Sequence, residues 1–349
     1  MSETLTVALM DALPFAILLV DHGEKIVQAN PVARVMFGEA LAGRPFVTVL
    51  RQPAIGEALE AALRQGQPGR VRLRLAAPGR EVSALATVAP MPPDSDLRMP
   101  RGGAMVSIED VTAVEEAEAI RRDFVANVSH ELRTPLTALM GFIETLRGAA
   151  REDPAARDRF LSIMEREASR MNRLVGDLLS LSRVEAEERR RPTAELDLSA
   201  VLKGAMQTLQ PLAQAQGASL SRMGEEGRLP VQGDPDQLTQ VFANLIENAI
   251  KYGGGAVEVV VSRIAHEPVL RGPGLKVEVI DHGEGIDEIH LPRLTERFYR
   301  VDTHRSREQG GTGLGLAIVK HIVARHRGRL KIESEKGKGA RFSVFLPLG

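Results

Sequence analysis

The stretch Phe124-Val-Ala-Asn-Val-Ser-His130-Glu-Leu-Arg-Thr-Pro-Leu-Thr137 places a single histidine inside an apolar repeat of helical period. Apolar residues recur every three or four positions, which predicts an amphipathic helix with one buried stripe. The stripe consists of Phe124, Val128, Leu132, Leu136, Leu139, Ile143 and Leu146. His130 lies off the stripe and is predicted to face solvent. Glu131 follows it, and Thr134 lies one helical turn further on, where i and i+4 side chains meet.

The helix around His130 is predicted to be long and to form half of a hairpin. Thr112 and Glu115 have the spacing of a capping box, so the helix is expected to start there. Residues 148 to 154 break the pattern, and a second amphipathic helix follows, with one apolar side made of Phe160, Met164, Ala168, Met171, Val175, Leu178 and Leu181. A short connection between two such helices predicts an antiparallel hairpin.

A two-helix hairpin buries too little apolar surface to be stable alone. Pairing with a second copy into a four-helix bundle is therefore expected, and packing against a neighbouring domain of the same chain is the alternative. The charged segment 185 to 193 ends in Arg-Pro and is interpreted as the helix end and a linker.

The composition of the chain restricts its class. Its 349 residues suffice for two or three domains. The net charge of −1 gives no electrostatic reason to expect a nucleic-acid partner. The chain has no cysteine, which excludes disulfides and thiolate metal sites. Its longest strongly apolar run, residues 13 to 20, is far shorter than the roughly 20 residues that cross a bilayer. We therefore expect no membrane span in this chain, and we expect the protein to be located in the cytoplasm.

The segments on either side of the hairpin are predicted to be globular. A β-hairpin is expected over 13 to 30, a helix over 55 to 63, and strands at 71 to 75, 81 to 88 and 104 to 108. The part beyond residue 195 alternates helices and strands, which predicts a sheet with helices on one side. Its helices are expected at 199 to 216, 235 to 252 and 315 to 326, and its strands at 256 to 263, 275 to 280, 329 to 334 and 340 to 347.

Three segments of this last part contain residue types suited to a phosphorylated ligand. Asn244, Asn248 and Lys251 share one face of a predicted helix. Amide oxygens suit Mg²⁺, and a lysine supplies a point charge for phosphate. Asp281-His-Gly283-Glu-Gly285 combines glycines that let backbone approach a planar ligand with a carboxylate that can accept a hydrogen bond from an amine. Gly310-Gly-Thr-Gly-Leu-Gly-Leu316 opens onto a helix, whose first N–H groups can bind phosphate.

In this order, these segments resemble the N, G1 and G2 boxes of the histidine-kinase ATP-binding domain. Glu296-Arg-Phe-Tyr-Arg300 resembles its F box and Gly337-Lys-Gly339 its G3 box, while the stretch around His130 resembles the H box. The first 110 or so residues, with Asn30 after the hairpin and Asp110-Val-Thr112 at the exit, resemble a PAS sensor domain. The chain as a whole is similar to phosphate-regulon sensor kinases of the PhoR type.

The resemblance implies a multidomain α+β architecture. Residues 1–111 would be a PAS-like α/β sensor, and residues 112–190 a dimerising and phosphotransfer hairpin that forms a four-helix bundle. Residues 191–349 would be a catalytic α/β sandwich with the Bergerat ATP-binding fold. The implied function is a sensor histidine kinase that forms a homodimer, uses ATP and Mg²⁺, and serves a response regulator as its partner. In some relatives such a chain is the cytoplasmic part of an inner-membrane sensor.

The resemblance also implies residue roles. His130 would be the phosphate acceptor, Glu131 would hold its ring, and Thr134 would place water for dephosphorylation of the regulator. Asn248 would be the Mg²⁺ ligand, and Asp281 would bind the adenine amine. The nucleotide-binding set is Asn244, Asn248, Lys251, Tyr252, Asp281, Gly283, Gly285, Tyr299, Arg300, Gly311, Thr312, Gly313, Leu314 and Gly315. Residues 301 to 309 would form a lid over ATP.

Two other functions compete with the kinase. One is a related ATPase that hydrolyses ATP to drive a clamp-like motion. Those ATPases need a catalytic glutamate one turn before the metal-binding asparagine, where this chain has Asn244. The other is a non-catalytic adaptor, which the presence of every box residue argues against.

Overall fold

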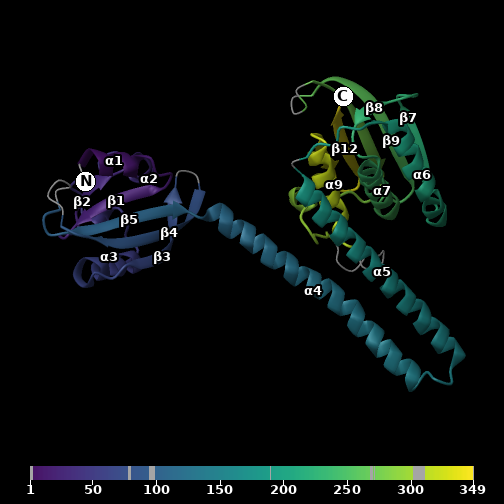
Figure 1. Cartoon of the computed structure of the whole chain (residues 1–349). Coiled ribbons are helices and arrows are strands. Elements are labelled where there is room, and N and C mark those ends of the chain that lie inside the picture. The colour runs from purple at the N-terminus through teal and green to yellow at the C-terminus, as the bar shows by residue number, and fades with distance from the viewer. Residues whose placement is uncertain are drawn as a thin grey trace. The chain divides into compact units, whose positions relative to one another are not determined.

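The protein divides into two compact units, Met1–Ala126 and Asn127–Gly349. The computed structural model describes residues 3–77, 80–93, 99–188, 190–267, 270, 272–301 and 311–348 (Figure 1). Helix α4 (Thr112–Arg147) begins in the first unit and continues into the second. Within the described ranges, no helix combines the length and apolar character that crossing a membrane needs.

The first unit is built on an antiparallel sheet with the strand order β2-β1-β5-β4-β3. Its elements are α1 (Glu3–Asp11), β1 (Ala16–Asp21), β2 (Ile26–Ala29), α2 (Pro31–Phe37), η1 (Phe46–Thr48), α3 (Pro53–Gln65), β3 (Gly69–Ala77), β4 (Arg80–Met91) and β5 (Gly103–Asp110). The predicted hairpin is confirmed, because β1 pairs antiparallel with β2. Asp21 closes the turn by accepting hydrogen bonds from the N–H groups of Gly23 and Lys25, both at 2.9 Å.

Both faces of this sheet are covered by apolar side chains. The larger core lies under α2 and α3 and includes Leu18, Phe46 and Leu59. A smaller cluster on the other face joins Met10 of α1 to Ile17, Leu19, and Met99. Helix α1 was not predicted from the sequence. Strand β4 extends to Met91, beyond its predicted end at residue 88, and residues 94–98 lie outside the described residues.

Helix α4 starts at the predicted residue but by another mechanism than a capping box. The Thr112 hydroxyl accepts a hydrogen bond from the N–H of Ser83 at 2.9 Å, so it binds strand β4. The Glu115 carboxylate lies 3.7 Å from the guanidinium of Arg72 on β3. Both side chains therefore fix the helix to the sheet.

Helices α4 and α5 (Pro154–Glu187) form the predicted antiparallel hairpin. Phe142, near the end of α4, stacks on Phe160, near the start of α5, with ring centroids 5.4 Å apart. The apolar stripe of α4 is only partly covered in the single chain, since Leu136 is 51% exposed. On α5 the fully buried side chains are Leu174, Leu181 and Val184, of which Leu181 belongs to the predicted stripe and the other two do not.

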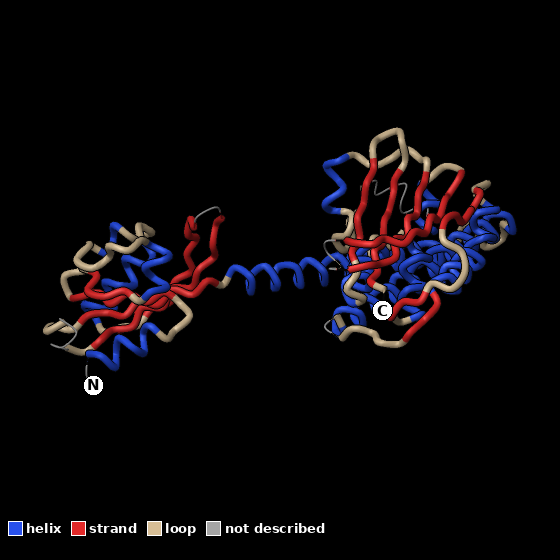
Figure 2. The backbone as a smooth tube through the Cα atoms, turned by 90° about the horizontal axis from the view of Figure 1, so that it is seen from above, coloured by secondary structure: helices blue, strands red, loops and turns tan. Residues whose placement is uncertain are grey.

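The C-terminal part of the second unit is a five-stranded sheet with the order β11-β12-β10-β9-β7, with helices packed on it (Figure 2). Its elements are β6 (Glu195–Asp197), α6 (Leu198–Ala215), β7 (Ser219–Gly224), β8 (Pro230–Gln232), α7 (Pro235–Tyr252), β9 (Ala256–Glu267), β10 (Gly272–Asp281), η2 (Glu288–Arg293), α9 (Gly315–Arg325), β11 (Arg329–Ser334) and β12 (Ala340–Pro347).

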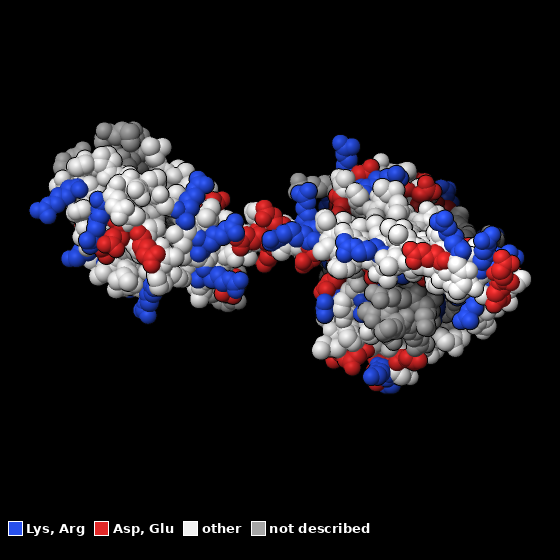
Figure 3. All heavy atoms as spheres, turned by 90° about the horizontal axis from the view of Figure 1, so that it is seen from below, with Lys and Arg blue, Asp and Glu red and all other residues white. Residues whose placement is uncertain are grey.

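Every helix and strand predicted in this part is present, with ends that shift by a few residues at most. Strands β6, β7 and β8 were missed. β7 lies at the edge of the sheet, pairs parallel to β9, and has no fully buried residue, so it lacks the apolar alternation that identifies a strand. Helix α9 packs against α5, which explains why Leu174, Leu181 and Val184 are buried. On the surface shown in Figure 3, acidic and basic side chains lie among one another.

Candidate functional site

A cavity of about 530 Å³ lies in the second unit, which is a usual size for a small-molecule site. Its walls include helix α7, the turn after β10, η2 and the segment that follows it, the residues at the start of α9, strand β12, and helix α5 of the hairpin. The residues predicted to bind nucleotide that line it are Asn244, Asn248, Lys251, Tyr252, Asp281, Gly285, Tyr299, Arg300, Gly311, Thr312, Gly313 and Gly315.

Helix α7 presents its polar face to the cavity, as the spacing of its residues predicted. The amide nitrogen of Asn244 donates to the carbonyl of Gly315 at 3.3 Å, which joins α7 to the first turn of α9. The ammonium of Lys251 lies 2.6 Å from the carboxylate of Glu247, one turn earlier on the helix. This arrangement places a cation at the cavity and supports it with a carboxylate.

The residues around Asn248 suit a magnesium ion bound together with phosphates. Among the described residues, no hydrogen bond engages the Asn248 side chain, which lines the cavity. No group of three or more His, Asp or Glu side chains within the described parts could hold a metal ion alone. A single amide oxygen plus phosphate and water ligands is a normal set for Mg²⁺. The donor chemistry therefore fits a metal that enters with a nucleotide.

Asp281, at the end of β10, is a buried carboxylate within the cavity wall. One of its oxygens accepts hydrogen bonds from the N–H groups of Gly283 at 3.0 Å and Ala340 at 3.2 Å. Burial raises the pKa of the Asp281 carboxyl, and these two bonds counteract that rise. A carboxylate has about four acceptor positions, so the two backbone bonds leave capacity for a ligand amine.

The glycines of the site allow backbone to approach backbone. Gly285 has φ +67°, and a Cβ there would come within 2.1 Å of the carbonyl oxygen of Glu335. Gly313 has φ +72°, and its Cβ would come within 2.9 Å of the Cα of Phe298. We expected Gly285 to let backbone approach a planar ligand, and Gly313 to belong to a segment that binds phosphate. In the structure, each glycine allows another backbone segment of the cavity wall to approach closely, because it has no Cβ.

The segment that resembles an F box is held by its own neighbours. The Tyr299 hydroxyl lies 2.6 Å from Nδ1 of His290, and the guanidinium of Arg293 lies 4.2 Å from the centre of the Tyr299 ring. Arg300 donates a hydrogen bond to the carbonyl of Gly311 and reaches to within 3.5 Å of the Glu131 carboxylate. Arg300 thus connects the cavity with helix α4.

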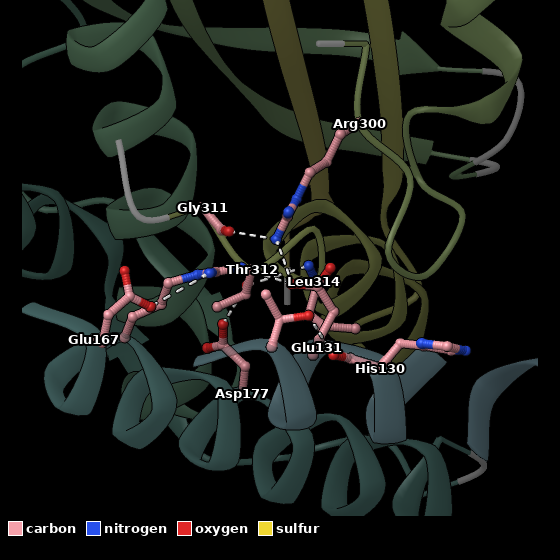
Figure 4. A network of polar contacts seen from close by, with 10 residues as sticks. His130, Glu131, Glu167, Asp177, Arg300, Gly311, Thr312 and Leu314 are labelled. Atoms are coloured by element: carbon pink, nitrogen blue, oxygen red, sulfur yellow. Dashed lines mark hydrogen bonds and ion pairs between the residues drawn. The ribbon is translucent and has the colours of Figure 1, made fainter. Parts of the chain in front are cut away.

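The three residues predicted to act on α4 are close together but differ in environment. His130 is exposed and points away from the polar contacts around it (Figure 4). Glu131 lies 2.6 Å from Arg170 of α5, so in this conformation its carboxylate faces Arg170 and Arg300. The Thr134 hydroxyl donates to the backbone carbonyl of His130 at 3.1 Å.

Two of the predicted nucleotide-binding residues do not line the cavity. Gly283 lies behind it, where its N–H binds Asp281. The side chain of Leu314 is fully buried, and its backbone N–H donates to the Thr312 hydroxyl at 3.3 Å. For the predicted lid over 301 to 309, Val301 lines the cavity, whereas residues 302–309 lie outside the described residues.

Charged or titratable side chains that were not predicted also line the cavity, among them Glu247, His290, Arg173 and Asp177. Glu247 could have been found, because it precedes Asn248 and lies four positions before Lys251 on the helix. His290 had no recognisable signal. Arg173 and Asp177 belong to the hairpin, and only the packing of α5 brings them to the cavity.

The sequence matches the PAS domain over residues 6–67, the His Kinase A (phospho-acceptor) domain over 120–187, and the histidine kinase-, DNA gyrase B-, and HSP90-like ATPase family over 233–349. It is 34% identical over 337 residues to the sensor-like histidine kinase SenX3 of Mycolicibacterium smegmatis, covering 96% of this chain and 83% of that protein.

Other relatives are matched over part of their length. The phosphate regulon sensor protein PhoR of Pseudomonas aeruginosa is 41% identical over 244 residues, which cover 70% of this chain and 54% of that protein. The aligned segment thus spans about half the length of that curated relative. Among solved structures, histidine kinase ThkA, crystallised in complex with response regulator protein TrrA, matches 98% of both chains with a TM-score of 0.52 at 21% identity. That likeness shows a shared fold.

Proposed function

The chain belongs to the sensor histidine kinase family, and from this membership we propose that it phosphorylates its own His130 from Mg-ATP and passes the phosphoryl group to an aspartate of a response regulator. The observation that supports this most is that one compact unit holds both parts the reaction needs. An exposed histidine lies on α4, and a cavity of nucleotide size lies beside the same hairpin.

In this proposal, different cavity residues bind the adenine, the phosphates and the metal ion. Asp281 accepts a hydrogen bond from the adenine amine at the buried end of the cavity. Lys251 places a positive charge by the phosphates, and Asn244 and the amides at the start of α9 complete their surroundings. Asn248 holds Mg²⁺, which spreads the negative charge of the phosphates during transfer. Positioning by these groups supplies most of the rate in such a reaction.

The acceptor chemistry needs a neutral imidazole with one ring nitrogen available to attack. That nitrogen forms a bond to the γ-phosphorus of ATP while the bond from phosphorus to the bridging oxygen breaks and ADP leaves. Glu131 stabilises the positive charge that develops on the ring. Because Glu131 faces Arg170 and Arg300 in this structure, its carboxylate must turn toward His130 for this role.

The remaining roles follow the same proposal. The hairpin pairs with a second copy to form a homodimer, and Thr134 assists a phosphatase activity toward the regulator. The three domains are 1–111, 112–190 and 191–349, and the chain acts in the cytoplasm, alone or as part of a membrane-anchored sensor. The partly uncovered apolar stripe of α4 supports the dimer.

Incubation of the full chain with γ-labelled ATP and Mg²⁺ tests the proposal. We expect label that survives alkali and is lost in acid, the stability of a phosphohistidine, and we expect His130→Gln to abolish it. His22→Gln, which changes another exposed histidine in a turn, serves as the control and should label normally. ATP turnover without labelled protein would contradict the kinase and favour an ATPase of the same fold.

A further inference from the structure

Asp177 is part of the nucleotide cavity although it belongs to the hairpin. It lies on α5, and its carboxylate accepts a hydrogen bond of 2.6 Å from the hydroxyl of Thr312. Thr312 precedes the first turn of α9, and its hydroxyl also accepts the N–H of Leu314 at 3.3 Å. This one bond therefore joins α5 to the segment predicted to bind phosphate (Figure 4).

A second contact attaches the same segment to the hairpin. Arg300 donates to the carbonyl of Gly311, next to Thr312, and also lies 3.5 Å from Glu131 on α4. The side chains of Arg300 and Glu131 are only 6% and 15% exposed. Both helices of the hairpin thus hold residues 311 and 312, where a phosphate group would lie in the proposed function.

The charges around Asp177 disfavour its present position once phosphates arrive. Glu247 already repels its carboxylate, while Arg173 and Lys251 attract it. A nucleotide brings several further negative charges, which repel Asp177 and compete with it for the two cations. Such interactions are strong in a partly buried site, because salt and water screen them less than at the surface.

We propose that Asp177 is a positioning residue that latches the phosphate-binding segment to the hairpin, and that nucleotide phosphates displace it. This inference rests on the proposed function. By linkage, a ligand that opens the latch must itself bind more tightly when the latch is absent. The hairpin and the nucleotide therefore oppose each other at this segment.

The test is the affinity of the full chain for ADP and for a non-hydrolysable ATP analogue with Mg²⁺, measured by calorimetry. Asp177→Ala removes both the charge and the acceptor, and Asp177→Asn removes the charge but retains an acceptor for Thr312. We expect both to bind nucleotide more tightly, Asp177→Ala by about fivefold to tenfold, the low end of usual coupling between sites. Asp158→Asn removes an exposed carboxylate from α5 far from the cavity and should not change affinity.

Hydrogen exchange supplies a second readout, which locates the change in the segment that Asp177 holds. Amides of residues 311–316 should exchange faster in nucleotide-free Asp177→Ala than in the native chain, while amides in the core of α7 stay unchanged. Unchanged or weaker nucleotide binding by both Asp177 variants would overturn the latch, and so would equal tightening by Asp158→Asn. A native chain that binds no nucleotide would overturn the proposed function itself, which separates the two failures.

Discussion

Asn30 shows how much a single buried polar residue can organise. Its side-chain oxygen accepts hydrogen bonds from the N–H groups of Ile17 and Ala33, at 2.9 and 3.0 Å. Its nitrogen donates to the carbonyls of Met10 and Phe15 at 3.0 and 2.9 Å. The side chain is fully buried, so these four bonds replace the water that the groups lose on folding. One amide thus joins α1, β1 and the start of α2.

Replacement of this residue tests that role. Asn30→Ala removes the side-chain partner of four backbone groups, three of them in buried hydrogen bonds, which should destabilise the first unit by about 3 kcal/mol or more. The measurement is hydrogen exchange of β1 and β5 amides in the full chain, with Gln65→Ala, an exposed amide in the same unit, as the control. Equal protection in both variants would show that Asn30 does not organise the unit.

At the scale of elements, His326 couples the end of α9 to the start of α7. Its Nε2 accepts the N–H of Asp234, the residue that caps α7, at 3.0 Å. Its Nδ1 therefore carries the proton and donates to the carbonyl of Ile322 at 2.8 Å. Burial lowers the pKa of His326, and the nearby charge of Arg325 acts in the same direction. The neutral ring is the form that fits both helices.

This geometry predicts the sign of a pH dependence. Because the pKa of His326 is lower in the folded than in the unfolded chain, the unfolded chain binds more protons. Its contribution to stability is complete above the unfolded value of about 6.5 and is lost as the pH falls through the folded value. Urea midpoints from pH 7.5 down to about 5.5 should fall less in His326→Gln than in the native chain. In His22→Gln the urea midpoint should change with pH as it does in the native chain. The same pH dependence in His326→Gln would show that His326 does not cause the loss of stability.

At the scale of the molecule, the hairpin has more apolar surface than one chain covers. Leu136 and Met140 are 51% and 58% exposed on α4, and Leu179 is 62% exposed on α5. The alternative expected from the sequence, in which the hairpin packs on its own neighbouring domain, accounts for part of the surface, because α9 covers one face of α5. The rest supports a second copy as the cover.

A charge on the uncovered face should separate the copies. Leu136→Asp is expected to cost about 2 kcal/mol at each of the two equivalent positions of a symmetric dimer, which weakens it about a thousandfold. Sedimentation of the full chain measures this. Val35→Asp, at an 82% exposed apolar residue of the first unit, should leave the oligomeric state unchanged. A native chain that sediments as a monomer would contradict the dimer.

Local pattern was sufficient for most of the fold and much of the site. The repeat around His130 and the spacing of Asn244, Asn248 and Lys251 define helix faces, because a helical period relates neighbours in sequence to neighbours in space. The same logic failed for β7, an edge strand with no buried residue, and for α1, whose short sequence shows little periodicity.

By itself, the sequence determined most of the elements of this protein and the face of α7 that lines the cavity, because those depend on contacts within a few turns of chain. Only the tertiary structure decided that Asp177 and Arg173 belong to the same cavity, and that Glu131 meets Arg170 and Arg300. Glu131 is separated by 39 positions from Arg170 and by 169 from Arg300, and Asp177 by 135 from its partner Thr312. Several apolar faces compete for burial, and this competition decides which side of α5 packs against α9. A local sequence pattern does not predict the result of that competition.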